Sequence, residues 1–301
     1  MTPNEERIDT QKDRRDRSDN KDNKDQIVKS LKEALSGLGG NIFSSNIIFP
    51  MDVIKVRMQV PNSTYNGVFD GLHKIIKEEG ILALYTGLSS EIFRSGLQTF
   101  IYFFVYSTLK DYAIKYLNKR NKSEDSKLPV IHNLFIGFIA GCITQIFVNP
   151  LSVIQTRIIA SKRSIGLLNM AMTIIRKEGL LALYKGIIPT FILCINPAIQ
   201  YLVFDNLKCR IPNASSIENF IMGAISKVVA TISTYPYIMA KVRLQYSSNT
   251  KYSGTLDVIL NILLQDGFFG LYTGLQPQLL KSILSGALLL MAKEKIAKLI
   301  A

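Results

Sequence analysis

The sequence predicts an all-α membrane protein whose six transmembrane helices form three pseudo-threefold repeats. The first observation is a segment that occurs three times, beginning at Pro50, Pro150 and Pro236, each time after a long apolar run. The second is that the runs at 34–51, 128–156 and 187–203 contain no Lys, Arg, Asp or Glu. Runs of this length suit the hydrocarbon core of a bilayer, which is ~30 Å thick. One unit used three times explains both observations.

Each copy has the same internal spacing. The glycine of an acid–Gly pair follows the proline after 30, 29 or 31 residues in the three copies. An aromatic residue and a further glycine come after this pair. The pairs are Glu79–Gly80, Glu178–Gly179 and Asp266–Gly267, and the later glycines are Gly87, Gly186 and Gly274. The spacing places the repeats at 29–117, 128–210 and 215–301.

Within each repeat, the spacing predicts two spanning helices joined by a short amphipathic one. The first runs through the proline, which removes a hydrogen bond and bends the helix there. The short helix, at 69–78 in the first copy, ends at the acid–Gly pair because glycine favours the C-terminal cap. The second spanning helix begins after the later glycine, which gives even-numbered helices at 88–116, 187–210 and 275–299.

Composition supports a membrane protein with anionic partners. Mean hydropathy is +0.18 and 48% of residues are hydrophobic, with a net charge of +13. The cationic excess favours anionic lipid headgroups and anionic solutes, whereas no basic cluster with interleaved aromatic residues indicates nucleic-acid binding. A soluble solenoid of unusually apolar helices is the alternative. Residues 1–28 alternate acids and bases, so we expect a disordered extension rather than a secretory or mitochondrial leader.

Nothing in the sequence predicts a metal site, a cofactor or an enzyme. The three cysteines, Cys142, Cys194 and Cys209, lack ligand-like spacing, and the two histidines are far apart. No phosphate-binding Gly-Lys-Ser/Thr loop and no nucleophile–base arrangement is present.

The three proline segments and acid–Gly pairs resemble the signature of the mitochondrial carrier family, and the resemblance covers residues 30–300. It implies six transmembrane helices, three amphipathic helices on one face and alternating access to a central site. Within the family, the stretches at 149–157, 196–200 and 279–295 look most like peroxisomal nucleotide and coenzyme A carriers.

The resemblance implies a substrate site on the even-numbered helices, about seven residues after the glycine that opens each. This offset gives Arg94, Leu193 with Cys194 beside it, and Lys281. Charged side chains at membrane depth are costly and indicate function, although a base near a helix end can also extend to the interface. Two cations and an apolar pair suit a ligand with phosphates at one end and a flat ring at the other. Asn196 is a further candidate for substrate binding, and Lys227 is a weaker candidate for the same cavity.

The resemblance also implies a gate at the proline end of the odd-numbered helices. In the family, an acid of one odd-numbered helix pairs with a base of the next, which here gives Asp52–Gln155, Ser152–Lys241 and Ile238–Lys55 without a complete ion pair. Gln59 and Gln245 match the glutamines that brace such pairs. We therefore expect a weak gate. It could open more easily or leak, or Arg57, Arg157 and Arg243 could take the place of the missing gate charges; the sequence leaves these alternatives open.

The resemblance implies a second gate at the other end, formed by the family's aromatic-acid-x-x-base motif on the even-numbered helices. Residues 204–208 match it fully, whereas 106–110 lack the acid and 293–297 lack the aromatic residue and the base. If the two losses belong to a single pair, Ser107 with Ala297, the pairs Lys110–Asp205 and Lys208–Glu294 remain. The sequence does not fix which way round the pairs run.

The sequence thus predicts a transporter of nucleotide-like anions (ATP, ADP, AMP, CoA, NAD or FAD) that works by exchange as a monomer. A multi-pass protein of the peroxisomal membrane is favoured, with the mitochondrial inner membrane as the alternative. A carrier of another small anion and a non-transporting membrane scaffold are the alternative functions.

Overall fold

A computed structural model describes residues 46–61, 63–121, 129–161, 165–211, 214–247 and 252–285. The N-terminal extension at 1–28, most of the last expected helix and Glu294 lie outside this part of the chain. The described residues form helices and turns without a strand, and the expected all-α fold is confirmed.

The odd-numbered spanning helices are the helix at 46–59, α4 (Val130–Ala160) and α8 (Ser216–Tyr246). Pro50, Pro150 and Pro236 each lie inside a helix that continues past them. Ser215 begins α8 with a capping box, in which its side chain and that of Glu218 each accept a backbone hydrogen bond. The bend at each proline stays a prediction.

The short amphipathic helices are α2 (Val68–Glu79), α5 (Leu167–Glu178) and α9 (Thr255–Gln265). The turn of 3-10 helix η1 (Ile81–Tyr85) follows α2, η2 (Leu180–Tyr184) follows α5, and the single turn α10 (Gly267–Gly270) follows α9. Gly80 caps α2 with a φ of 86°, a left-handed conformation that only glycine adopts without strain. In the third copy Asp266 is the cap and Gly267 opens α10.

Each amphipathic helix packs on the residues three and four positions after the proline of its own repeat. Three separate buried clusters result: Val53 and Ile54 with Val68 and Ile75; Val153 and Ile154 with Met170 and Ile174; Met239 and Ala240 with Val258 and Ile262. Burial of these side chains fixes the proline end of every odd-numbered helix against its own repeat.

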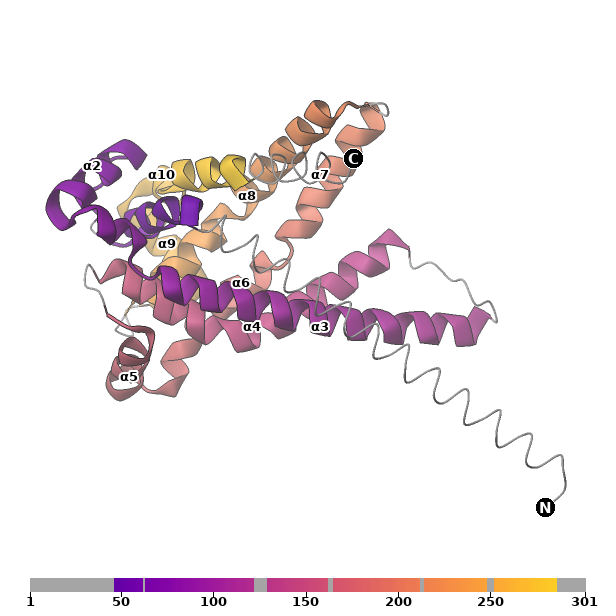
Figure 1. The fold of residues 1–301 in the computed structure, drawn as a ribbon, viewed down its shortest axis with the longest axis horizontal. Coiled ribbons are helices and arrows are strands. Elements are labelled where there is room, and N and C mark those ends of the chain that lie inside the picture. The colour runs from indigo at the N-terminus through magenta and orange to yellow at the C-terminus, as the bar shows by residue number, and fades with distance from the viewer. Residues whose placement is uncertain are drawn as a thin grey trace, which may run out of the picture. The chain divides into compact units, whose positions relative to one another are not determined.

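The even-numbered spanning helices are α3 (Leu88–Asn121), the pair α6 (Ile187–Leu193) and α7 (Asn196–Arg210), and the helix at 275–285. The single helix expected at 187–210 is wrong, because it is broken at Cys194 and Ile195. Pro197, at the start of α7, has no N–H to donate to the preceding turn, and its ring disfavours a regular helix there. Figure 1 shows α3 along α4 and α7 along α8, the helix pairs with the most extensive contacts.

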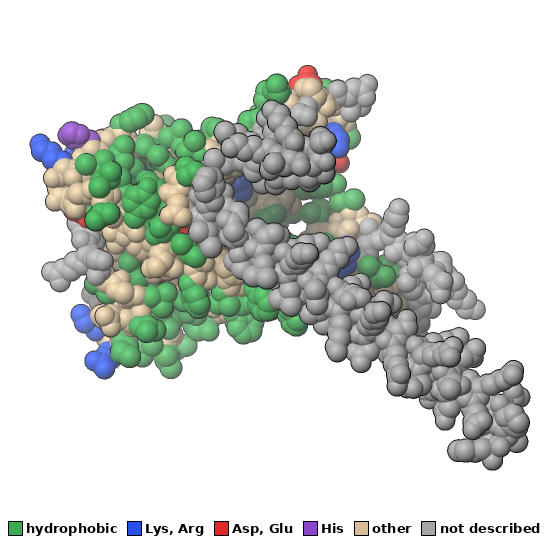
Figure 2. Space-filling view, viewed as in Figure 1, with side chains coloured by type: hydrophobic (Ala, Val, Ile, Leu, Met, Phe, Trp, Pro, Cys, Tyr) green, Lys and Arg blue, Asp and Glu red, His purple; other side chains and the backbone are tan. Residues whose placement is uncertain are grey.

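Apolar side chains cover much of the face shown in Figure 2. Large exposed examples come from α3 and α4: Phe100, Phe103, Phe104, Phe135 and Phe147. In the described part of the chain, Val130–Ala160 and Leu180–Arg210 are long and apolar enough to span a bilayer, each with a mean hydropathy of 1.8. Lipid is the environment in which such a surface is stable.

Candidate substrate cavity and gate

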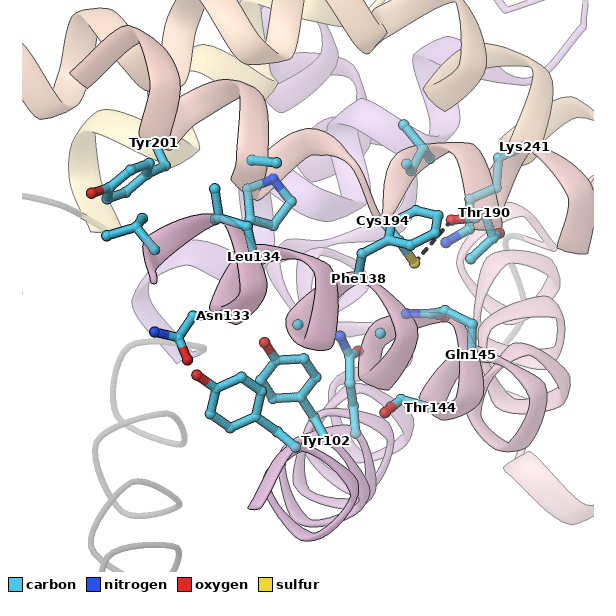
Figure 3. Close-up of a pocket in the computed structure, with 18 residues that line it drawn as sticks. Tyr102, Asn133, Leu134, Phe138, Thr144, Gln145, Thr190, Cys194, Tyr201 and Lys241 are labelled. Atoms are coloured by element: carbon cyan, nitrogen blue, oxygen red, sulfur yellow. Dashed lines mark hydrogen bonds between the residues drawn. The ribbon is translucent and has the colours of Figure 1, made fainter. Parts of the chain in front are cut away.

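A cavity of about 630 Å³ lies between α3, α4, α6, α7 and α8. Figure 3 places Lys241 beside Thr190 and Cys194, away from Asn133 and Tyr201. Asn133 and Gln145 both line the cavity from α4, so it extends along roughly 18 Å of this helix. Leu193 and Cys194, two of the sequence-predicted contacts, are part of its wall.

One wall of the cavity is aromatic. Tyr102 and Tyr106 lie one turn apart on α3, and their rings stack with centroids 5.9 Å apart and an angle of 14° between the planes. A Cβ on Gly137 of α4 would lie 3.3 Å from the Tyr102 hydroxyl, so the small residue makes room for the ring. The pair offers a flat surface on which another ring can stack.

Asn196, a predicted substrate contact, instead faces α8. Its amide nitrogen donates to Thr234 Oγ1 at 2.8 Å and to the Ala230 carbonyl at 3.2 Å. Its amide oxygen accepts a hydrogen bond from Lys227 Nζ at 3.2 Å. Asn196 therefore links α7 to α8 and holds Lys227.

At the predicted gate, three links join the repeats, and the first of them joins repeats one and three. Lys281 Nζ lies 2.6 and 2.7 Å from the two carboxylate oxygens of Asp52. The expected pairing of Asp52 with Gln155 is therefore wrong, and the gate does hold a complete ion pair. The family-based comparison missed it because it paired the odd-numbered helices only with one another, whereas Lys281 comes from an even-numbered helix.

The second link joins repeats one and two. Arg94 Nε donates to Gln155 Oε1 at 2.7 Å, and its Nη2 lies 2.7 Å from Glu91 Oε1. Gln155 Nε2 in turn donates to Glu91 Oε2 at 2.7 Å. The motif did not reveal Glu91. An acid three residues before a base on one helix face can be read from the sequence, whereas the burial of Glu91 is seen only in the structure.

The third link joins repeats two and three and carries no charge. Gln245 Nε2 donates to Ser152 Oγ at 3.1 Å, and Thr156 Oγ1 donates to Gln245 Oε1 at 2.9 Å. Ser152 thus contacts the bracing glutamine rather than Lys241. The other predicted brace, Gln59, donates to Tyr235 Oη at 3.0 Å.

Two lysines give the gate region an excess of positive charge. Within the described residues, the side chains of Lys55 and Lys241 form no ion pair and no hydrogen bond. Ile238, the residue that the family pattern pairs with Lys55, is apolar and cannot form an ion pair with it. Lys55 lies within electrostatic range of Asp52, Glu91, Arg94 and Lys281. Four cations and two carboxylates share this region, so it attracts anions.

The three arginines after the prolines do not replace the missing gate charges. Arg57 Nη1 lies 2.6 Å from Glu79, and Arg157 and Arg243 pair in the same way with Glu178 and Asp266. Arg57 Nε also donates to the carbonyl of Ile159 at 3.1 Å, and Arg157 Nε to that of Gln245 at 2.9 Å. Arg57 and Arg157 thus cap the end of the odd-numbered helix of the next repeat, a role the sequence did not reveal.

The second gate stays a prediction. In the part of the chain that the structure describes, Lys110, Asp205 and Lys208 form no ion pair, and Glu294 lies outside it.

Comparison with known proteins agrees with this architecture. A family model described as "Mitochondrial carrier protein" matches residues 27–117, 126–215 and 212–301. The chain is 35% identical to "Peroxisomal adenine nucleotide carrier 1" of Glycine max, over 90% of this chain and 91% of the relative. It is 32% identical to "Peroxisomal membrane protein PMP34" of Mus musculus, over 89% and 92%. It is 28% identical to "Peroxisomal adenine nucleotide transporter 1" of Saccharomyces cerevisiae, over 89% and 92%. Together with the threefold helical hairpins, the three matches show that the chain belongs to the mitochondrial carrier protein family.

Proposed function

We propose that the protein is a membrane transporter of nucleotide-like anions, among them ATP, ADP, AMP, CoA, NAD and FAD. It belongs to a family of carriers rather than enzymes. The soybean and yeast relatives are named for adenine nucleotides, and a relative from Arabidopsis thaliana is named for nicotinamide adenine dinucleotide. We further propose exchange of one anion for another as the mode of transport.

The observation that carries the proposal is the cavity beside the gate. It combines the stacked Tyr102–Tyr106 wall with Lys241, which lines the same hollow. Arg94 and Lys281 belong to the adjoining cationic region. A nucleotide has a ring that can stack on an aromatic wall and phosphates that bind cations, so one molecule can satisfy both parts. The volume of about 630 Å³ is in the usual range of small-molecule sites.

In the proposed cycle, the closed gate at the proline end leaves the cavity to be filled from the opposite side. Bound anion then shifts the balance between two gate states because its affinities for them differ. Arg94 and Lys281 bind phosphate, Leu193 and Cys194 contact the base, and Asn196 positions Lys227. Asp52, Lys55, Gln155 and Lys241 make up the gate, with Gln59 and Gln245 as braces.

The names of the relatives also support a multi-pass protein of the peroxisomal membrane, with the mitochondrial inner membrane as the alternative site. The protein acts as a monomer, and its cationic excess contacts anionic lipid headgroups.

Transport by purified protein in liposomes tests the proposal. Labelled ATP should accumulate in liposomes preloaded with AMP at least ten times faster than in liposomes preloaded with malate. Lys241→Gln should reduce the uptake about ten-fold by removing a cation from the cavity. Lys177→Gln, on an exposed face of α5, is the matched control and should transport at the normal rate. Faster exchange of malate than of any nucleotide would contradict the proposal.

A further inference from the structure

Glu91 is a buried carboxylate at the contact between repeats one and two. Its side chain accepts four hydrogen bonds at 2.7–2.9 Å, three from Arg94 and one from Gln155. The residue is 9% exposed, although it lies in the first turn of a spanning helix. A carboxylate this deeply buried is costly unless it is paired, and its pairing involves a base proposed to bind substrate.

In this arrangement Arg94 has no free donor pair for a phosphate. Its Nε and Nη2 both bind Glu91, Nε also binds Gln155, and Nη1 donates to Gln98 Oε1 at 2.7 Å. A carboxylate and a phosphate present a similar pair of oxygens to the guanidinium fork. Glu91 therefore occupies the place on Arg94 that a phosphate would take.

We propose that Glu91 is a positioning residue whose carboxylate acts as a built-in substitute for substrate phosphate. The inference rests on the proposed function and assigns a mechanism to the same site. An incoming phosphate displaces Glu91 from Arg94. Because Gln155 is bonded to both members of this pair, the same exchange also loosens the link between α3 and α4. Anion binding and release of the gate thus become one event.

The surrounding charges favour such an exchange. Lys241 lines the cavity and is without an ion pair among the described residues, so it can attract the anion first. Asp52 holds Lys281 in a comparable way, at 2.6 and 2.7 Å. Both carboxylates come from repeat one, and both neutralise a cation that the substrate needs.

The test uses the full chain, pyrophosphate and ATP as separate ligands, and three variants. Glu91→Gln removes the competing charge, and Glu91→Asp retracts it by one methylene group. Glu78→Gln is the control, because it makes the same glutamate-to-glutamine substitution at an exposed position of the same repeat. The first measurement is the concentration of each ligand that gives half of the maximal rise in melting temperature. The second is the rate of ATP efflux from preloaded liposomes without external substrate.

Glu91→Gln should lower the half-maximal concentration of both ligands at least five-fold and raise the efflux at least three-fold. Glu91→Asp should change both quantities in the same direction by less, and it decides the matter if Glu91→Gln does not fold. A lower melting temperature with unchanged half-maximal concentrations would show a purely structural Glu91 and would overturn the inference. Stabilisation by pyrophosphate but not by ATP, with the Glu91→Gln shift intact, would refute nucleotide transport while leaving the charge exchange standing.

Discussion

Equivalent side chains in the three repeats differ in how completely they are bonded. Arg57 and Arg157 each contact a glutamate through two nitrogens, whereas Arg243 makes one contact, at 2.9 Å to Asp266. Arg243 Nε is buried and has no partner among the described residues, and the side chain of Asp266 is 44% exposed. Aspartate is one methylene group shorter than glutamate, so it does not present both oxygens to the buried fork.

Lengthening this acid should stabilise the protein. Asp266→Glu gives Arg243 a second charge-assisted hydrogen bond, worth about 1–2 kcal/mol. The free energy of unfolding in detergent, from denaturant titration, should rise by this amount. Glu79→Asp is the reciprocal change and should lower it. An unchanged free energy for both variants would show that the length of the acid is unimportant.

At this scale the sequence predicted candidate residues better than their partners. The offset that the family resemblance implies, counted from Gly87 and Gly274, identified Arg94 and Lys281, and the structure places both beside predicted gate residues. It did not predict that Asp52 and Gln155 are their partners, because that depends on how far side chains reach between helices. Glu91 lies outside the repeated motif, so comparison of the three copies did not reveal it.

Among the elements, the proline end of repeat two is held by a cluster around Glu178 at the end of α5. Arg157 and Lys185 both pair with this carboxylate, and both also donate to the Ser247 carbonyl at the end of α8. Burial alone would raise the pKa of Glu178, but the hydrogen bonds from Arg157 and Lys185 outweigh it and hold the pKa below its ordinary value of 4.5. The charged form therefore stabilises the folded state.

This contribution should be present above about pH 4.5 and lost as the pH falls through the lower pKa of the folded state. Melting temperatures of the unmodified protein should therefore decline below pH 4.5 more steeply than those of Glu178→Gln, which has nothing to protonate. Asp111→Asn, at an exposed site on α3, should keep the steeper decline. Equal slopes for the protein and Glu178→Gln would rule out this role.

The sequence predicted elements well where periodicity and glycine determine them. The amphipathic helix expected at 69–78 is Val68–Glu79, and even-numbered helices begin directly after Gly87 and Gly186. The break between α6 and α7 was the exception. Pro197 lies at this break, but a proline can bend a spanning helix or interrupt it, and the sequence pattern does not distinguish the two outcomes.

Across the whole molecule, the three links of the gate differ in chemistry. An ion pair joins repeats three and one, a charged network joins one and two, and neutral hydrogen bonds of Gln245 join two and three. Neutral hydrogen bonds contribute less than charged ones, so the third link is the weakest of the three.

A charge placed at this link should strengthen the gate. Ser152→Asp puts a carboxylate beside Gln245 and supplies the acid that the family pattern pairs with Lys241. The melting temperature without substrate should rise by several degrees, and the maximal exchange rate should fall at least three-fold because opening must break the new bond. Ser89→Asp, at an exposed position in the first turn of α3, is the control for added charge. Faster exchange by Ser152→Asp would contradict this ranking of the links.

The arginine caps also bear on biogenesis. Arg57 is satisfied by a carbonyl of repeat two, and Arg157 by carbonyls of repeat three. In each of the first two hairpins the arginine is paired within its own repeat, with Glu79 or Glu178, but its Nε donor needs a carbonyl of the following hairpin. A chain that ends after the first or second hairpin leaves this donor without its acceptor. We therefore expect such fragments to be targets for membrane quality control rather than independent folding units.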